Sequence, residues 1–263
     1  MAWYTGDPTY DTVLALALAL APTAVVALRF MKAPYGRFGP SGGLAVSART
    51  GWFLMELPAT VVFLVFYLSG PRRAETVPLV LASIWGLHYL NRGFLFPALM
   101  RVPKNAPRTF GLLTLATGAV VTAVHGYLNG AFFSDLGPHL VDGWLVDPRF
   151  GIGLSVYALG FLLNVHSDAV LRGLRTRDEV ARGEKVYRVP RGGGYRFVTN
   201  PSYLGELIMW TGFAIFTWSL AGVFILAISL ANLVPRALSN HRWYLERFED
   251  YPRSRRALIP YLL

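Results

Sequence analysis

The sequence has no cysteine, which excludes disulfide bridges, thiolate metal sites and a cysteine nucleophile. Its five histidines are scattered, and no two have metal-ligand spacing on one predicted helix, so we predict no metal. Only 15% of the 263 residues are charged and 54% are hydrophobic, which is too apolar for an ordinary soluble domain. No basic segment precedes the first apolar run, so we expect that run to be retained as a span and not cleaved as a signal peptide.

Apolar runs of about 20 residues, long enough to cross a bilayer, recur along the chain. They predict an all-α protein with one domain over residues 1–263, an integral membrane bundle of seven transmembrane helices with ligand-binding loops on its cytoplasmic face. The expected spans cover residues 12–30, 51–68, 77–95, 110–127, 152–165, 204–219 and 221–238.

The charges between the spans predict the orientation. The connections after the first, third, fifth and seventh spans are basic, whereas the one after the fourth contains Asp135, Asp142 and Asp147. The positive-inside rule then places the C-terminus in the cytoplasm and the N-terminus on the other side, with Arg72 and Arg73 as exceptions. The net charge is +10, and the cationic residues that produce it lie between apolar spans and form no nucleic-acid-binding motif. We therefore predict contacts with membrane lipid and phosphate, and no nucleic-acid partner.

The densest charge lies in residues 172–196, where eight cations accompany three anions. Arginine suits phosphate because its planar fork donates two hydrogen bonds at once. Polar residues at the two flanking helix ends predict a cup around a ligand; they are Asn164, His166, Asp168, Asn200, Tyr203 and Glu206. Two alternatives stay open: the positive-inside rule alone explains the basic loop, and helix capping explains Asn200 and Ser202.

Glu56 is an acid inside a predicted span, and an intramembrane charge is by default a functional hypothesis. Burial favours the neutral acid, which can donate a hydrogen bond to a substrate oxygen. Tyr89, near the cytoplasmic end of the next span, lies at a similar expected depth, so both groups can meet one carbonyl. The alternatives are a structural Glu56 paired with an arginine, and an interfacial Tyr89 beside a snorkelling Arg92.

Residues 240–251 mix aromatic and cationic side chains. They are interpreted either as a tail that closes over the cup or as an interfacial amphipathic helix.

Together these residues resemble the steroid 5-alpha-reductase family, membrane enzymes that reduce a conjugated enone with NADPH. The matching stretches include Trp52 to Pro58, His88-Tyr89, Asn164 to Asp168 with Leu171-Arg172 and Leu174-Arg175, Tyr187 to Pro190, Tyr203 to Glu206 with Trp210, His241 to Tyr244, and Phe248 to Pro252 with Ala257 to Pro260. The stretch from Arg101 to Arg108 matches the family poorly, so the resemblance does not say whether it contacts substrate or cofactor.

The resemblance implies seven helices with NADPH held in the cytoplasmic half. It implies that Glu56 and Tyr89 contact a steroid 3-keto oxygen, with Trp52 in the substrate site. The cofactor contacts that we predict from the cup and the resemblance are Arg37, Asn164, His166, Asp168, Arg172, Arg175, Tyr187, Arg188, Asn200, Tyr203, Glu206, Arg236, His241, Tyr244 and Arg255. We expect a monomer, and a bacterial homologue of the type 2 enzyme.

We therefore predict NADPH-dependent reduction of the 4,5 double bond of 3-oxo-4-ene steroids, by hydride transfer to C5. A membrane methyltransferase of the isoprenylcysteine type, which uses S-adenosylmethionine, is one alternative because it has a similar Tyr203 to Glu206 turn. Its sulfonium cofactor contains no phosphate, so the many arginines argue against it. A non-enzymatic sterol-binding protein is the other alternative, and it leaves Glu56 without a task.

Overall fold

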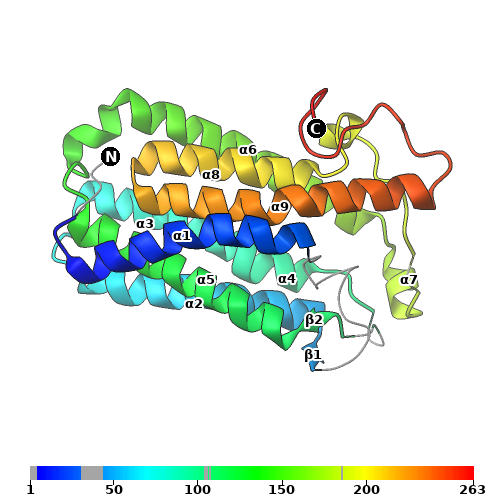
Figure 1. The fold of residues 1–263 in the computed structure, drawn as a ribbon, viewed down its shortest axis with the longest axis horizontal. Coiled ribbons are helices and arrows are strands. Elements are labelled where there is room, and N and C mark those ends of the chain that lie inside the picture. The colour runs from blue at the N-terminus through cyan, green and yellow to red at the C-terminus, as the bar shows by residue number, and fades with distance from the viewer. Residues whose placement is uncertain (1–4, 31–43, 104–105, 107, 185) are drawn as a thin grey trace.

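The computed structural model describes residues 5–30, 44–103, 106, 108–184 and 186–263. Long helices run side by side in one elongated bundle, and the chain enters at one end and finishes at the other (Figure 1). In chain order the elements are α1 (Pro8–Phe30), β1 (Ala45–Val46), α2 (Ala48–Ser69), α3 (Thr76–Tyr89), a π-helical turn (Leu90–Leu95), α4 (Phe96–Leu99), β2 (Phe110–Gly111), α5 (Leu112–Ala131), a second π-helical turn (Phe132–Leu136), a 3₁₀ turn (Asp142–Val146), α6 (Pro148–Gly173), α7 (Arg177–Ala181), a 3₁₀ turn (Gly193–Arg196), α8 (Pro201–Thr217) and α9 (Leu220–Arg247).

The helices α1, α2, α3, α5, α6, α8 and α9 each overlap one expected span. The third span was predicted to reach residue 95, but α3 ends at Tyr89, whereas α5, α6 and α9 continue past their expected ends at residues 127, 165 and 238. Among the described residues, four helical segments are long and apolar enough to cross a bilayer: Ala48–Ser69, Leu112–Leu136, Pro148–Gly173 and Leu220–Arg247. The mostly helical membrane fold is thus confirmed. The count of seven spans stays a prediction, since α3 has 14 residues and α8 has 17.

Glycines allow two pairs of helices to approach closely. A Cβ at Gly205 of α8 would lie 2.6 Å from the backbone nitrogen of Asn164 on α6 and 2.7 Å from the carbonyl oxygen of Gly160. A Cβ at Gly126 of α5 would lie 2.9 Å from the backbone nitrogen of Phe63 on α2. Small residues are the usual contact between membrane helices because lipid gives them no hydrophobic reason to associate. The first contact places Asn164 beside the start of α8.

The core is rich in large aromatic side chains. The ring of Phe63 stacks on Trp85 with centroids 4.6 Å apart and meets Phe133 edge-on at 5.8 Å. Trp85 in turn lies 4.8 Å from the ring of Tyr89. Offset and edge-on aromatic contacts of this kind stabilise a core beyond the effect of burial alone. The Tyr89 ring is therefore packed against this aromatic cluster.

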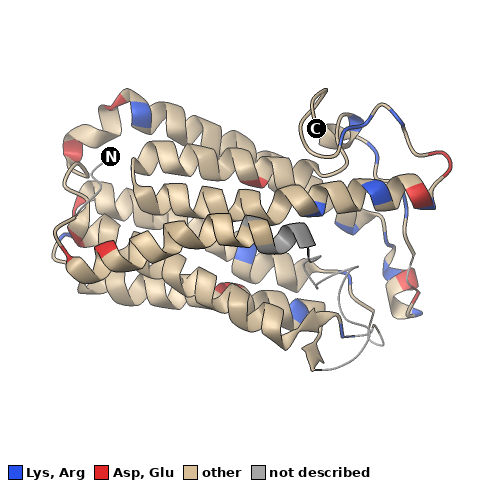
Figure 2. Cartoon of the chain, in the orientation of Figure 1, with Lys and Arg blue, Asp and Glu red and all other residues tan. Residues whose placement is uncertain are grey.

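The two ends of the bundle differ in charge: Lys and Arg gather at the end with the C-terminus and are few at the other end, where Asp and Glu outnumber them (Figure 2). Arg72, an exception to the predicted pattern, pairs with Glu75 at 2.9 Å and donates to the carbonyl oxygens of Gly137, at 2.8 Å, and Leu140. These hydrogen bonds connect the segment between α2 and α3 to the segment that follows α5. The orientation across the membrane stays a prediction.

Candidate active site

A cavity of about 910 Å³ lies inside the bundle, between α1, α2, α3, α5, α6, α8 and α9. Its volume is near the upper end of the range typical of small-molecule sites, roughly 300–1,000 Å³. Leu20, Val121 and Ile225 are among its apolar lining residues, and Glu56 and Tyr89 are among its polar ones. Trp52, the third predicted substrate residue, also lines the cavity. The structure therefore brings these three residues together, while their roles remain predictions.

Arg92 connects two acids in this cavity. Its Nε atom lies 3.5 Å from Oε1 of Glu56, and its Nη2 atom lies 3.3 Å from Oε2 of Glu206. Arg92 belongs to the π-helical turn that follows α3, and such turns occur frequently at functional sites. The arginine partner expected for a structural Glu56 is therefore present, so both interpretations of Glu56 remain. One guanidinium is shared between two carboxyl groups.

The guanidinium of Arg92 is held by aromatic rings as well as by the acids. Its central carbon lies 4.6 Å from the centroid of Trp52 and 5.2 Å from that of Phe96. Cation–π contacts of this length stabilise a desolvated cation. The sequence indicated Arg92 only as a snorkelling residue, although its position three residues after Tyr89, on the same helical face, was a signal for this site.

Tyr89 has a histidine partner that the sequence did not indicate. Its Oη lies 3.0 Å from Nδ1 of His125 on α5. The neighbouring His88 lies 3.2 Å from the hydroxyl of Tyr157 on α6. Sequence reasoning gave neither His88 nor His125 a role in the site, although His88 belongs to one of the stretches that match the family. A polar ring in the middle of an apolar span was the signal that could have found them.

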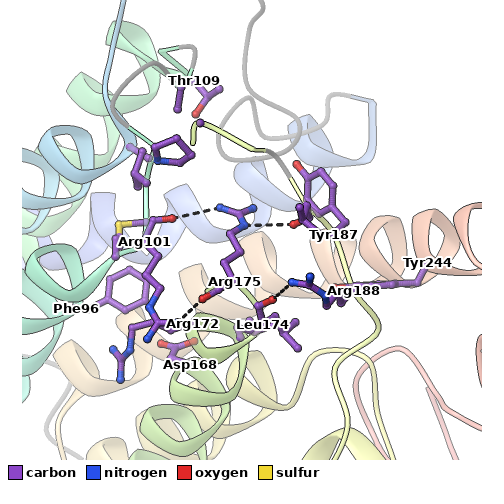
Figure 3. Close-up of a pocket in the computed structure, with 18 residues that line it drawn as sticks. Phe96, Arg101, Thr109, Asp168, Arg172, Leu174, Arg175, Tyr187, Arg188 and Tyr244 are labelled. Atoms are coloured by element: carbon purple, nitrogen blue, oxygen red, sulfur yellow. Dashed lines mark hydrogen bonds between the residues drawn. The ribbon is translucent and has the colours of Figure 1, made fainter. Parts of the chain in front are cut away.

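A second cavity, of about 430 Å³, adjoins the first, since Phe96, Asp168 and Leu171 line both. Six predicted cofactor residues line it and are labelled in Figure 3: Asp168, Arg172, Arg175, Tyr187, Arg188 and Tyr244. Arg101, to which the sequence gave no role, contributes a further cation. A cationic cavity beside an apolar one suits a molecule with phosphates at one end and a reactive group at the other.

Arg175 fastens the wall of the second cavity. It donates from Nε to the carbonyl oxygen of Val186 and from Nη1 to that of Arg101, at 3.3 Å each (Figure 3). Arg101 donates back to the carbonyl oxygen of Arg175. Because these bonds are long or made to neutral carbonyls, an anionic ligand would be a stronger acceptor for the same guanidinium.

Arg188 is paired with an acid. It donates to both carboxylate oxygens of Glu179 and to the carbonyl oxygen of Leu174. The hydrogen bond from Arg188 lowers the pKa of Glu179 to about 2, and the backbone N–H of Thr176 adds to this effect. Thr176 and Glu179 also form a reciprocal capping box at the start of α7. The loop that contributes Arg188 is thus ordered by its own charges.

Several predicted cofactor residues bond to other parts of the protein. Asn200 occupies the N-cap position of α8, yet its side chain makes no capping bond, so the capping alternative is wrong for this residue. Its amide nitrogen instead donates to the carbonyl oxygens of Ala237, at 3.1 Å, and Ala257, at 2.8 Å. Tyr203 accepts from Nε of Arg236 at 2.8 Å. These bonds join α8, α9 and the C-terminal segment.

Asn164, His166 and His241 also have protein neighbours. Asn164 donates to the carbonyl oxygen of Ser202 at 2.9 Å, which secures the end of α6 to the start of α8. His241 shares a hydrogen bond of 2.6 Å with Thr199. His166 packs on the 3₁₀ turn before α8, since a Cβ at Gly193 would lie 2.5 Å from its Nε2 atom. Arg37 lies outside the described residues.

The C-terminal segment contributes a buried cation. Residues 240–247 form the last turns of α9, and Tyr244 stacks on Tyr251 with centroids 5.3 Å apart. The guanidinium of Arg255 lies 5.2 Å from the Tyr251 ring. Its Nη1 atom is buried and has no hydrogen-bond partner within the described chain. A buried donor of this kind is costly, and a ligand phosphate oxygen would satisfy it.

Comparison with known proteins identifies the family to which the chain is similar. A family described as 3-oxo-5-alpha-steroid 4-dehydrogenase matches residues 108–263. The 3-oxo-5-alpha-steroid 4-dehydrogenase 1 of Rattus norvegicus is 36% identical over 256 residues, 96% of this chain and 95% of the relative. The steroid 5-alpha-reductase DET2 of Solanum lycopersicum is 34% identical over 256 residues, 96% of each chain. The 3-oxo-5-alpha-steroid 4-dehydrogenase 2 of Sus scrofa is 36% identical over 255 residues, 95% of this chain and 96% of the relative. Type 1 and type 2 relatives therefore match about equally well.

Proposed function

Because this chain belongs to the 3-oxo-5-alpha-steroid 4-dehydrogenase family, and is thus an oxidoreductase acting on CH–CH groups, we propose that it reduces the 4,5 double bond of 3-oxo-4-ene steroids. The observation that carries the proposal is the placement of Glu56 and Tyr89 in the wall of one largely apolar cavity of about 910 Å³. A steroid is a rigid apolar body with a polar oxygen at one end, and this cavity has matching walls.

The polar wall is suited to the charge that the reaction creates. When C5 gains a hydride, negative charge develops on the C3 oxygen, and donors aimed at that oxygen lower the barrier. Tyr89 supplies a hydroxyl and Glu56, if protonated, a carboxylic acid. Arg92 lies between Glu56 and Glu206 and is the cation that these two acids share within the described residues, so one of the acids is better buried as the neutral form. We assign the proton to Glu56.

The cofactor that fits the adjoining cavity is NADPH, which when bound supplies the hydride. Arg172, Arg175 and Arg188 line that cavity and exceed what one pyrophosphate needs, so a 2′-phosphate is the natural additional partner. Nη1 of Arg255 has no hydrogen-bond partner among the described residues, but Arg255 lines neither cavity, so its predicted contact with the cofactor rests on the family resemblance. Asp168 lines both cavities, which supports its proposed contact with the cofactor where cofactor and substrate meet.

The remaining steps need only the residues of the cavity and water. Once the hydride is on C5, Glu56 and Tyr89 stabilise the enolate oxygen, and C4 takes a proton from water. The hydride on C5 and the proton on C4 together add two hydrogens across the 4,5 double bond and saturate it. We also propose a multi-pass orientation with the C-terminus and both cavities' polar ends towards the cytoplasm, in keeping with the cationic end of the bundle (Figure 2).

The direct test is reduction of a 4-ene-3-one steroid such as progesterone by the purified protein in detergent, with NADPH or NADH. We expect a product heavier by two hydrogens, with the new hydrogen at C5 on the α face, and a clear preference for NADPH. Mass spectrometry and NMR of the product give both results. A folded protein that leaves the double bond intact with either cofactor would contradict the proposal.

A further inference from the structure

Tyr89 and His125 form a buried pair at the edge of the 910 Å³ cavity. The 3.0 Å between Tyr89 Oη and His125 Nδ1 is a hydrogen-bond distance. Their exposures are 3% and 0%, so water does not compete for this bond. The ring of Trp85 lies 4.8 Å from Tyr89 and 4.6 Å from His125 and restrains both. Both side chains also line the cavity.

The direction of this hydrogen bond decides what Tyr89 can do. A tyrosine hydroxyl has one proton and can also accept. If Tyr89 donates that proton to His125, none remains for a substrate oxygen. If His125 donates from Nδ1 instead, the phenolic proton is available to a second acceptor. Accepting a bond on oxygen also polarises the O–H group and makes it a stronger donor.

The surroundings of the other ring nitrogen favour donation by His125. Its Nε2 atom is buried and has no hydrogen-bond partner in the part of the chain that the structure describes. A neutral imidazole has one N–H group. On Nε2 this group would be a buried donor without an acceptor, which is rarer and costlier in proteins than a bare acceptor. On Nδ1 the same group is satisfied by Tyr89.

We propose that His125 is a positioning residue whose Nδ1–H holds the Tyr89 hydroxyl with its proton towards the substrate's 3-keto oxygen. This inference rests on the proposed function, because His125 has the task only if Tyr89 donates to a carbonyl. It assigns a residue of α5 to a reaction for which the sequence indicated only α2 and α3.

Two substitutions of His125 separate this role from simple packing. In His125→Asn the side-chain amide nitrogen can occupy the place of Nδ1, whereas in His125→Gln it reaches only the place of Nε2. We expect kcat for progesterone reduction to fall about 10- to 100-fold in His125→Gln and to stay within about threefold of the parent in His125→Asn. KM for the steroid should change little in either variant.

The same substitutions in a Tyr89→Phe background provide the control. Without a hydroxyl to orient, neither change of His125 should alter kcat further. Binding of a saturated 3-oxo-steroid without cofactor, followed by tryptophan fluorescence, shows that each variant keeps its cavity. A loss in His125→Gln that persists undiminished beside Tyr89→Phe would overturn the proposal, because it would be a packing effect.

A measurement on the unaltered side chain complements the variants. In protein labelled with ¹⁵N-histidine, the chemical shifts should identify Nδ1 of His125 as the protonated nitrogen; a proton on Nε2 would overturn the proposal without any substitution. If the parent protein itself fails to reduce a 4-ene-3-one, the proposed function has failed and this inference fails with it. If the parent is active and His125→Gln equals it, only the positioning role has failed.

Discussion

Replacing Glu56 by leucine should nearly abolish steroid reduction while the protein stays folded and still binds NADPH. The substitution removes one of two proposed donors to the developing oxyanion, and the loss of one such donor typically costs about 100- to 1,000-fold in rate, or roughly 3–4 kcal/mol. The cofactor cavity does not include Glu56 among its lining residues, so cofactor affinity should change much less.

The surroundings of Glu56 explain why the variant should fold. After Glu56 is removed, Arg92 still has its ion pair with Glu206 at 3.3 Å and its contacts with the rings of Trp52 and Phe96. Its charge is therefore still paired. A buried charge left without any partner would cost about 3–5 kcal/mol, and that situation does not arise here. The structural interpretation of Glu56 predicts the reverse pattern, lower stability with unchanged turnover per folded molecule.

The assay is single-turnover reduction of progesterone by purified variants with saturating NADPH, beside thermal unfolding of the same samples. Glu56→Gln keeps a donor and the shape but is a weaker acid, so we expect a large loss of kcat that is still smaller than for leucine. Met55→Leu is the matched control, because Met55 lines the same cavity one position earlier and donates nothing. A Glu56→Leu variant with near-parental rate would refute the donor-pair mechanism.

Four further predictions concern other parts of the protein. Tyr89→Phe should slow single-turnover reduction less than Glu56→Leu, because the carboxyl donor survives; an equal or greater loss would argue against the ranking of the two donors. Arg175→Ala should raise the dissociation constant for NADPH, measured by fluorescence titration, more than it slows the chemical step, and unchanged affinity would exclude Arg175 from the cofactor site. A reporter fused after Leu263 should be active only in the cytoplasm, and activity on the other side would contradict the orientation. The pKa of Glu179 is about 2 in the folded protein, below its ordinary value of 4.5, so the stability that its pairing with Arg188 contributes should be complete above pH 4.5 and disappear as pH falls towards 2. Proteolysis of the segment that contains Arg188 should therefore increase in acid. Glu179→Gln should remove this pH dependence.

The sequence alone was sufficient to predict the helical membrane fold and the family. A run of about 20 apolar residues can cross lipid only if its backbone bonds are satisfied internally, so composition predicts helices at these positions. Glu56 could be identified as a candidate from the sequence because a carboxyl group inside an apolar span is costly to bury. Arg172, Arg175 and Arg188, which line the second cavity, were predicted because they gather in one connection between spans, whereas Arg101 lies in an earlier connection and was missed.

The contacts between helices were not predictable in the same way. Arg92 meets Glu206, which is 114 residues away, and Tyr89 meets His125, which is 36 residues away. Membrane helices are apolar on most faces, so hydrophobic periodicity does not show which face meets which neighbour. Close glycine contacts such as that of Gly205 with α6 set the register between helices, and they are decided only when the chain packs. Composition and the positions of the charges predict the helical segments and the buried Glu56, because both are properties of one stretch of chain. Which polar residues meet, such as Tyr89 and His125, follows only from the packed fold, because it depends on how closely the backbones approach and on the rotation of each helix about its axis.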